Sequence, residues 1–359
     1  MRIRRRSVLL ILTGVLAACA VAQQKGGENE TGPYEVVPNW PQPPSSDGWT
    51  WGSVAAVWAE SPERVWVFQR GELEVLKDPI GSGGIPKRVA TGAKPRWQNC
   101  LVVLDRNGRV IESWRQHDDK FIRPHRIVIN PFDPERHVWL VDDGAHQVFK
   151  FTHDGAKLVM VIGEKGKPGN DPYHFNRPTD LAFLPNGDFY VSDGYVNTRV
   201  VKYDKNGKYL LEWGKPGKGP GEFNLVHGIS IDVDRQRVYV SDRSNSRIQV
   251  FDLAGEFIEA WTDIRSPYYL ALSKDHHLVV SDGVTQKILK YDLEGKLLHS
   301  WGTFGGFPGG LWGVHQVSVD GEGNLYVAEV FNGRLQKFRP KAGASRALLI
   351  GETTHSLTR

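Results

Sequence analysis

The sequence predicts an all-β fold, a six-bladed β-propeller, from three observations. A pattern recurs every 40 to 52 residues, apolar and polar residues alternate with period two inside each copy, and no segment has helical periodicity. A repeat of this length with about four strands per copy is typical of propeller blades. A β-sandwich with additional strands would not explain a pattern that returns six times.

Each copy contains a short strand that ends in Asp or Glu, a polar turn, and a second strand that ends in Phe or Tyr. A glycine-containing hairpin and a further apolar strand follow, often closed by Trp-Gly. The clear copies are Val138–Phe151, Phe189–Tyr203, Val238–Phe251, Leu278–Tyr291 and Leu325–Phe338, and the hairpin glycines are Gly108, Gly155, Gly207, Gly255 and Gly295. A sixth, degenerate copy supplies Val65–Phe68, and we expect the last copy to continue through Lys341–Ile350.

The N-terminus predicts an exported protein. Residues 1–22 combine a basic start with a short apolar run, as a signal peptide does. Leu16–Cys19 resembles a bacterial lipobox, which would lipidate Cys19, whereas Ala20–Ala22 is an ordinary cleavage site. We therefore expect a periplasmic or cell-envelope location, with membrane attachment only through a lipid on Cys19.

Composition sets the remaining boundaries. Residues 23–48 are rich in Gly, Pro, Ser, Glu and Gln and predict a flexible tether, followed by the propeller at 49–350 and a C-terminal tail at 351–359. A net charge of only +4 gives no reason to expect nucleic acid. Cys100 has no intrachain partner for a disulfide once Cys19 is removed or lipidated, so the stability of the fold depends on its hydrophobic core. We also expect a monomer.

Three histidines occupy one register position in alternate copies. Aligned at the start of the first strand, five copies place His125, Thr179, His227, Tyr268 and His315 at the same position. Equivalent residues of a propeller ring its axis, so the three imidazoles would stand about 120° apart. Three histidines with an open fourth position are the ligands of a catalytic zinc site. The bland alternative, in which such histidines cap strands or line a wet channel, does not explain the strict alternation.

A second set of residues follows the acidic residue at the end of the second strand. Arg243 and Arg70 take matching places in two copies, and Tyr195 lies two residues after Asp193. The arginines could bind a carboxylate in bidentate fashion, and the tyrosine could exchange a proton beside a metal. Salt bridges between loops would be the structural alternative for the arginines, and simple packing the alternative for the tyrosine.

The segments YVSDRSNSRIQVFD and YVAEVFNGRLQKF resemble NHL repeats. PHRIVI, DDGAHQVFKF, HFNRPTDLAF and YVSDGYVNTRVVKY are more specific and resemble peptidyl-α-hydroxyglycine α-amidating lyases over about residues 65 to 340. The resemblance implies that His125, His227 and His315 bind zinc, that Tyr195 is catalytic, and that Arg70 and Arg243 line the active site. It also implies cleavage of the N–C bond of an α-hydroxyglycine to an amide and glyoxylate, with a carboxylate-bearing small molecule or peptide as the substrate.

Two departures from that family affect the expectations. Gln316 stands where the family has an Asp that contributes to a structural calcium site, which weakens the case for calcium. Gly313 replaces a methionine and is expected to open the floor of the pocket. Two other functions stay open: a non-catalytic NHL propeller that binds a protein, peptide or glycan at the cell envelope, and another metal-dependent propeller hydrolase.

Overall fold

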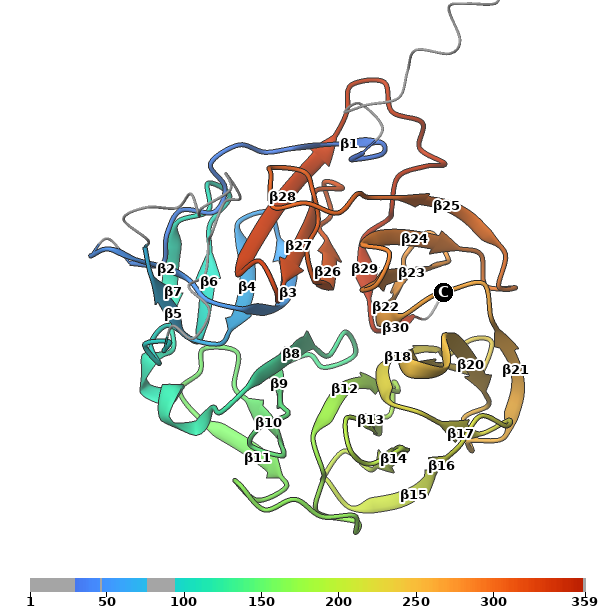
Figure 1. Ribbon diagram of the computed structural model, residues 1–359. Coiled ribbons are helices and arrows are strands. Elements are labelled where there is room, and N and C mark those ends of the chain that lie inside the picture. Colours follow the sequence, from blue (N-terminus) through green and yellow to red (C-terminus); the bar gives the residue numbers. More distant parts are fainter. Residues whose placement is uncertain (1–29, 46, 76–93, 358–359) are drawn as a thin grey trace, which may run out of the picture.

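The protein is a six-bladed β-propeller, which confirms the predicted fold class (Figure 1). The structure, a computed structural model, describes residues 30–45, 47–75 and 94–357. The expected signal peptide and Cys19 lie outside these residues. Within them, no helix has the length and apolarity needed to cross a membrane.

The first strand of every blade lies nearest the axis, and the later strands follow outward (Figure 1). Blade 1 consists of β3 (Val54–Ser61), β4 (Arg64–Gln69), β6 (Leu101–Leu104) and β7 (Val110–Ser113). Blade 2 consists of β8 (Pro124–Ile129), β9 (Val138–Asp142), β10 (Gln147–Phe151) and β11 (Leu158–Ile162). Blade 3 consists of β12 (Pro178–Phe183), β13 (Phe189–Asp193), β14 (Arg199–Tyr203) and β15 (Tyr209–Trp213).

The second half of the ring repeats this order. Blade 4 consists of β18 (Val226–Asp232), β19 (Arg237–Asp242), β20 (Arg247–Phe251) and β21 (Phe257–Trp261). Blade 5 consists of β22 (Pro267–Ser273), β23 (His277–Asp282), β24 (Lys287–Tyr291) and β25 (Leu297–Trp301). Blade 6 consists of β26 (Val314–Val319), β27 (Leu325–Glu329), β28 (Arg334–Pro340) and β1 (Tyr34–Val36). Short elements on the loops are β2 (Trp49–Trp51), β5 (Glu72–Glu74), β16 (Lys215–Pro216), β17 (Glu222–Phe223) and the 3-10 helices η1 (Arg115–Lys120) and η2 (Arg243–Asn245).

The ring is closed by the N-terminal segment. β1 pairs antiparallel with β28, so the outer strand of blade 6 comes from residues expected to form a tether. Residues 341–350, expected to continue that blade, contain no strand. Tyr34 is fully buried, and its hydroxyl accepts a hydrogen bond from the backbone N–H of Ile350. The first and last parts of the propeller are therefore joined by main-chain pairing, which explains why the last copy lacks a fourth strand of its own.

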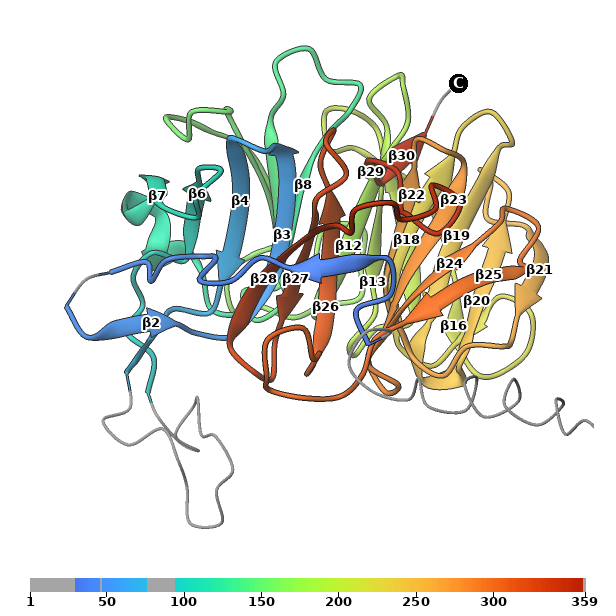
Figure 2. The same ribbon diagram turned by 90° about the horizontal axis from the view of Figure 1, so that it is seen from above.

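The C-terminal residues add two short strands at one end of the axis. β29 (Thr353–Thr354) pairs with β22, and β30 (Ser356–Leu357) pairs with β18. Figure 2 shows them at one end of the ring, with β2 toward the other. Both strands contact the last residues of β18 and β22, which places them at the end opposite the first residues of the inner strands.

The repeated glycines and tryptophans join neighbouring blades. The hairpin residue Gly155 has φ +69°, and a Cβ built on it would lie 2.5 Å from Trp114 of the preceding blade. Gly255 is related in the same way to Trp213 of the preceding blade, with a distance of 2.6 Å. Only glycine provides both the positive φ and the space for the indole ring. The repeated pattern therefore encodes packing between blades as well as turns within them.

The recurrent acidic residues tie loops together. Asp142 accepts hydrogen bonds from the backbone N–H groups of Ile122, Arg123 and Ala145, each at 2.8 Å. Burial raises the pKa of Asp142 to about 6, against the effect of these hydrogen bonds. These carboxylates therefore have a structural role beside the axis.

Candidate metal centre and surrounding arginines

His125, His227 and His315 converge on the axis. They lie near the start of β8, β18 and β26, and their side chains are 0%, 0% and 1% exposed. One ring nitrogen from each lies within 4.8 Å of the others. The register predicted from the repeat thus brings the three imidazoles together from alternate blades.

The other three blades orient these imidazoles. Nδ1 of His125 donates to the carbonyl of Thr179 at 2.6 Å, and Nδ1 of His315 donates to that of Ala55 at 2.6 Å. Nδ1 of His227 donates to the carbonyl of Tyr268. Ala55, Thr179 and Tyr268 take the register position in blades 1, 3 and 5, so each histidine is held by the next blade. The proton on Nδ1 leaves the Nε2 lone pair free to face the axis.

The electrostatics keep these imidazoles neutral. Burial lowers the pKa of each well below its usual value near 6.5, and the neighbouring imidazoles and arginines lower it further. Nε2 of His315 is buried and has no hydrogen-bond partner among the described residues. Three neutral imidazoles, each with a fixed tautomer and an available lone pair, are chemically suited to hold one zinc ion.

A β-bulge occurs at this position in every blade. The pairing of the first two strands shifts between Pro124 and Arg126 in blade 2 and between Pro178 and Asp180 in blade 3. The equivalent shifts occur in blades 1, 4, 5 and 6. Consecutive residues of a regular strand point to opposite faces, and a bulge interrupts that alternation. The bulges therefore allow both the histidine and the following residue to approach the axis.

Tyr195 lies directly above two of the histidines. Its hydroxyl is 3.1 Å from Nε2 of His125 and 3.0 Å from Nε2 of His227. The loop that carries it follows β13, whose last residue pairs with Pro178 at the start of β12. Tyr195 is thus at the end of the axis where the inner strands begin, with its phenol oxygen next to the candidate metal ligands.

Arg70 and Arg243 flank this tyrosine. The guanidinium carbon of Arg243 is 5.3 Å from the centroid of the Tyr195 ring and 4.5 Å from that of Tyr268. Nε of Arg70 donates to the carbonyl of Pro124 at 3.1 Å, next to His125. Burial and the nearby Arg123 lower the pKa of Arg70 to about 10, so it stays charged at neutral pH. Within the described ranges, neither guanidinium has an ion-pair partner.

Two further arginines beside Tyr195 were missed by the sequence reasoning. The guanidinium carbons of Arg177 and Arg123 are 4.6 and 5.3 Å from the centroid of its ring. Both pair with the buried carboxylate of Asp143. A signal was present, since both directly precede the proline that opens an inner strand. Four guanidinium groups and one carboxylate therefore surround the phenol, leaving the site strongly positive.

The expectation about Gly313 is corrected by the structure. Gly313 has φ +76°, and a Cβ built on it would lie 2.6 Å from Cδ2 of Phe331. The phenylalanine side chain therefore occupies the space beside this glycine. The loss of a side chain at Gly313 accommodates Phe331 and does not simply enlarge the floor of the pocket.

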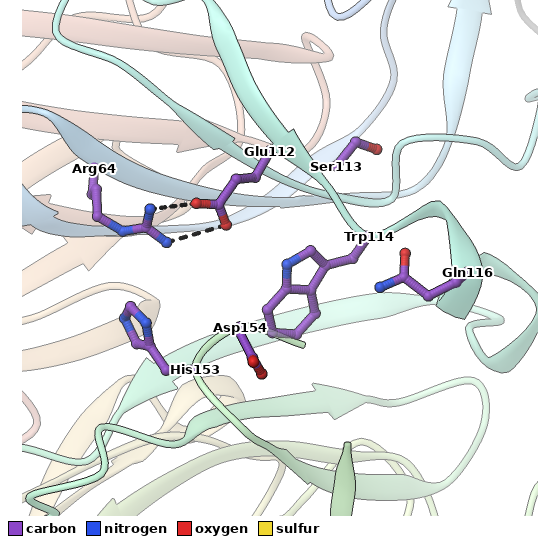
Figure 3. Close-up of a pocket in the computed structure, with 7 residues that line it drawn as sticks. All are labelled: Arg64, Glu112, Ser113, Trp114, Gln116, His153 and Asp154. Atoms are coloured by element: carbon purple, nitrogen blue, oxygen red, sulfur yellow. Dashed lines mark hydrogen bonds and ion pairs between the residues drawn. The ribbon is translucent and has the colours of Figure 1, made fainter. Parts of the chain in front are cut away.

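Other clusters and hollows lie away from the axis. Asp133, Glu135 and His137 also bring possible ligand atoms close together, but Nδ1 of the buried His137 is already hydrogen-bonded to Asp133 at 2.6 Å. Figure 3 shows a surface hollow at the outer part of blades 1 and 2, where Arg64 donates to Glu112. The hollow is lined by Arg64, Glu112, Ser113, Trp114, Gln116, His153 and Asp154. It shares no residue with the axial site.

Comparisons with known proteins agree with the fold. A family model described as a 6-bladed beta-propeller matches residues 168–271. A protein of unknown function from Bacteroides thetaiotaomicron, of solved structure, superposes with a TM-score of 0.55 at 14% identity, covering 80% of this chain and 70% of that one. At this identity the likeness shows the fold alone.

Two sequence relatives are named for amidation. A probable peptidyl-alpha-hydroxyglycine alpha-amidating lyase of Caenorhabditis elegans is 29% identical over 255 residues, which cover 67% of this chain and 69% of the relative. Peptidyl-glycine alpha-amidating monooxygenase B of Xenopus laevis is 30% identical over 215 residues, 58% of this chain. The match spans only 24% of that much longer protein. The chain is a six-bladed β-propeller homologous to peptidyl-α-hydroxyglycine α-amidating lyases.

Proposed function

We propose that the protein is a zinc-dependent lyase that cleaves the N–C bond of an acyl- or peptidyl-α-hydroxyglycine to an amide and glyoxylate. The observation that carries the proposal is the position of the Tyr195 hydroxyl beside Nε2 of His125 and His227. A proton-transfer group is thereby placed next to three imidazoles that can share a metal ion. The names of the relatives supply the reaction class.

His125, His227 and His315 would hold the zinc ion through Nε2. When bound, zinc supplies a Lewis acid that makes the substrate hydroxyl more acidic. The backbone carbonyls of Ala55, Thr179 and Tyr268 fix the imidazole rings before any metal arrives. This support lowers the reorganisation that binding requires.

Tyr195 moves the proton in the proposed reaction. As a phenolate it takes the proton from the hydroxyl on the α-carbon, the C–N bond breaks, and the C–O bond becomes the aldehyde of glyoxylate. The electron pair of the broken bond goes to the amide nitrogen, which takes the proton back from Tyr195. The phenolate is restored, and atoms and charges balance. The guanidinium groups of Arg123, Arg177 and Arg243 around the ring favour this negative charge.

Arg70 and Arg243 would bind the substrate carboxylate. Neither has a carboxylate partner within the described residues, whereas Arg123 and Arg177 are both paired with Asp143. An unpaired guanidinium in a partly desolvated site is suited to bidentate recognition of a carboxylate. Glyoxylate keeps this carboxylate, so the same contacts would hold substrate and product.

The loops around the site suggest the chemistry of the other end of the substrate. Val196, Val284 and Phe331 are 56%, 67% and 56% exposed, and each lies on the loop that follows the second strand of its blade. These loops are at the end of the axis that carries Tyr195. Exposed apolar side chains at the rim favour an apolar acyl group or side chain next to the hydroxyglycine.

The proposal is tested by incubating purified protein with α-hydroxyhippurate and measuring glyoxylate. Zinc-loaded wild type is expected to release glyoxylate and benzamide in equal amounts, and Tyr195→Phe is expected to release neither above the spontaneous rate. Equal rates for the two proteins would contradict the role of Tyr195. No release by zinc-loaded wild type, from this substrate or from peptides ending in α-hydroxyglycine, would favour a non-catalytic binding propeller.

A further inference from the structure

A second layer of residues lies on the axis directly beyond the histidines. It contains the residue that follows the register position in each blade, and the bulges bring it toward the axis. The members of this layer are Ala56, Arg126, Asp180, Gly228, Tyr269 and Gln316. The polar and aromatic members, Arg126, Asp180, Tyr269 and Gln316, are each at most 1% exposed. This is the level at which the family resemblance implies a structural calcium ion.

Arg126 is the dominant charge of this layer. Its side chain is fully buried, and its Nε lies 3.2 Å from Oδ1 of Asp180, which is also fully buried. Its guanidinium carbon is 4.7 Å from the centroid of the Tyr269 ring. It therefore connects blade 2 to Asp180 of blade 3 and to Tyr269 of blade 5. None of its three guanidinium nitrogens has a hydrogen-bond partner among the described residues, so the charge of Asp180 and the face of the Tyr269 ring are what offset its lost hydration.

His355 from the C-terminal segment closes the layer on the far side. Its Nε2 is 3.4 Å from Oδ1 of Asp180, and its ring lies 5.6 Å from that of Trp58. Its carbonyl accepts a hydrogen bond from the backbone N–H of Ile231. Asp180 is thus shared between Arg126 and an imidazole that the chain end brings to the axis.

The residues of this layer do not fit a calcium ion. Calcium takes six to eight oxygen ligands. The carboxylate of Asp180 already faces Arg126 and His355, and its Oδ1 accepts the backbone N–H of Leu181. The other carboxyl or amide oxygen of the layer is Oε1 of Gln316, which is buried and has no partner among the described residues. A divalent ion here would also lie close to a buried guanidinium, and like charges repel strongly in a site of low polarity.

We infer that Arg126 is a built-in cation that takes the place of a structural metal ion, so that this propeller needs no calcium on its axis. The guanidinium neutralises Asp180 and joins blades 2, 3 and 5 as part of the chain, without an ion that can dissociate. The inference concerns the layer beyond the histidines and holds whether or not these bind zinc. The lyase assay therefore cannot decide whether Arg126 replaces a metal ion. If this inference proved wrong, the proposed reaction at the histidines would be unaffected.

The direct test is calcium binding by metal-stripped, zinc-reloaded wild type. We expect no bound calcium by elemental analysis after dialysis against millimolar calcium, and no change in Tm. One calcium ion per chain, with a rise in Tm, would overturn the inference. Because this measurement uses the unmodified protein, it does not depend on any variant folding.

A pair of variants tests the role of the charge. Arg126→Met leaves Asp180 buried without its cation and is expected to lower Tm by about 5–8 °C. The double variant R126M/D180N removes both charges and should recover a clear part of that loss. If the double variant is no more stable than R126M, Arg126 acts by packing alone and the inference is wrong. The double variant R126A/Q316D removes the guanidinium and adds a second carboxylate beside that of Asp180. Calcium should raise the Tm of this variant but not that of wild type.

Discussion

Nδ1 of His315 lies 2.6 Å from the main-chain carbonyl oxygen of Ala55, which joins the last blade to the first at the centre of the ring. The equivalent contact joins His125 to Thr179 in the following blade. Each proposed metal ligand is therefore oriented by main chain from a neighbouring blade. The geometry of the site depends on the closure of the propeller, and no side-chain substitution can remove these carbonyls.

Replacing Tyr195 with Phe is expected to reduce kcat by about 10²–10⁴, the usual contribution of a general acid–base group. The phenyl ring would keep its contacts with Arg177 and Arg243, because both guanidinium groups face the ring. Zinc content should stay that of wild type, since the hydroxyl is adjacent to the imidazoles without being required to hold the metal. Loss of zinc together with activity would instead indicate that Tyr195 is a metal ligand.

Arg243→Ala is expected to lower kcat/KM by about thirty-fold, which corresponds to about 2 kcal/mol for a lost hydrogen bond to a charged group. Steady-state kinetics with α-hydroxyhippurate would measure the change. Arg237→Ala is the matched control, because that guanidinium donates to the carbonyls of Arg235 and Gln236 at the far end of the same blade. Equal effects of the two substitutions would argue against carboxylate binding by Arg243.

The metal-free protein should lose stability in acid. The folded-state pKa values of the three histidines are depressed, so the stability they contribute is present above the unfolded value near 6.5. That stability is lost as the pH falls toward the folded values, because the unfolded chain binds protons that the buried imidazoles do not.

The sensitive measurement is the slope of unfolding free energy against pH below 6.5, from urea titrations of wild type and His227→Gln. The variant should have a shallower slope, by up to about 1.4 kcal/mol per pH unit, since one fewer proton is taken up on unfolding. Asp142 and Asp193, whose pKa values burial raises to about 6, are present in both proteins and cancel in the comparison. Identical slopes would show that His227 is already protonated in the folded state.

The strand that closes the ring should matter for stability. Tyr34→Ala removes a fully buried ring whose centroid lies 5.6 Å from that of Trp301, together with the hydroxyl that accepts the N–H of Ile350. The substitution should cost about 3–5 kcal/mol. Urea unfolding would give the free energy. Tyr173, 55% exposed, supplies the control, and its replacement by Ala should change stability by less than about 0.5 kcal/mol. A small loss for Tyr34→Ala would mean that the ring closes without this strand.

The fold and the histidine register could be predicted because a repeat converts sequence spacing into spatial equivalence. Once His125, His227 and His315 were aligned, the symmetry of the propeller placed them around one axis. Arg70, Tyr195 and Arg243 followed from the next register position. Here the sequence is informative because each blade repeats the same geometry.

Other features depended on contacts that no repeat encodes. The closing strand Tyr34–Val36 has three residues in a polar segment, and its pairing with β28 spans almost the whole chain. Strand alternation predicts that Arg126 points away from the side taken by His125, and the bulge removes that alternation. The layer formed by Arg126 and Asp180 was therefore not predicted.

The central claim is that three imidazoles from alternate blades bind one zinc ion, and metal analysis of the purified protein tests it most directly. We predict about one zinc per chain in wild type, the stoichiometry of a three-histidine site. His315→Ala should lose the metal while keeping the circular dichroism of a β-propeller. A folded wild-type protein that stays free of zinc after equilibration with the ion would contradict the account.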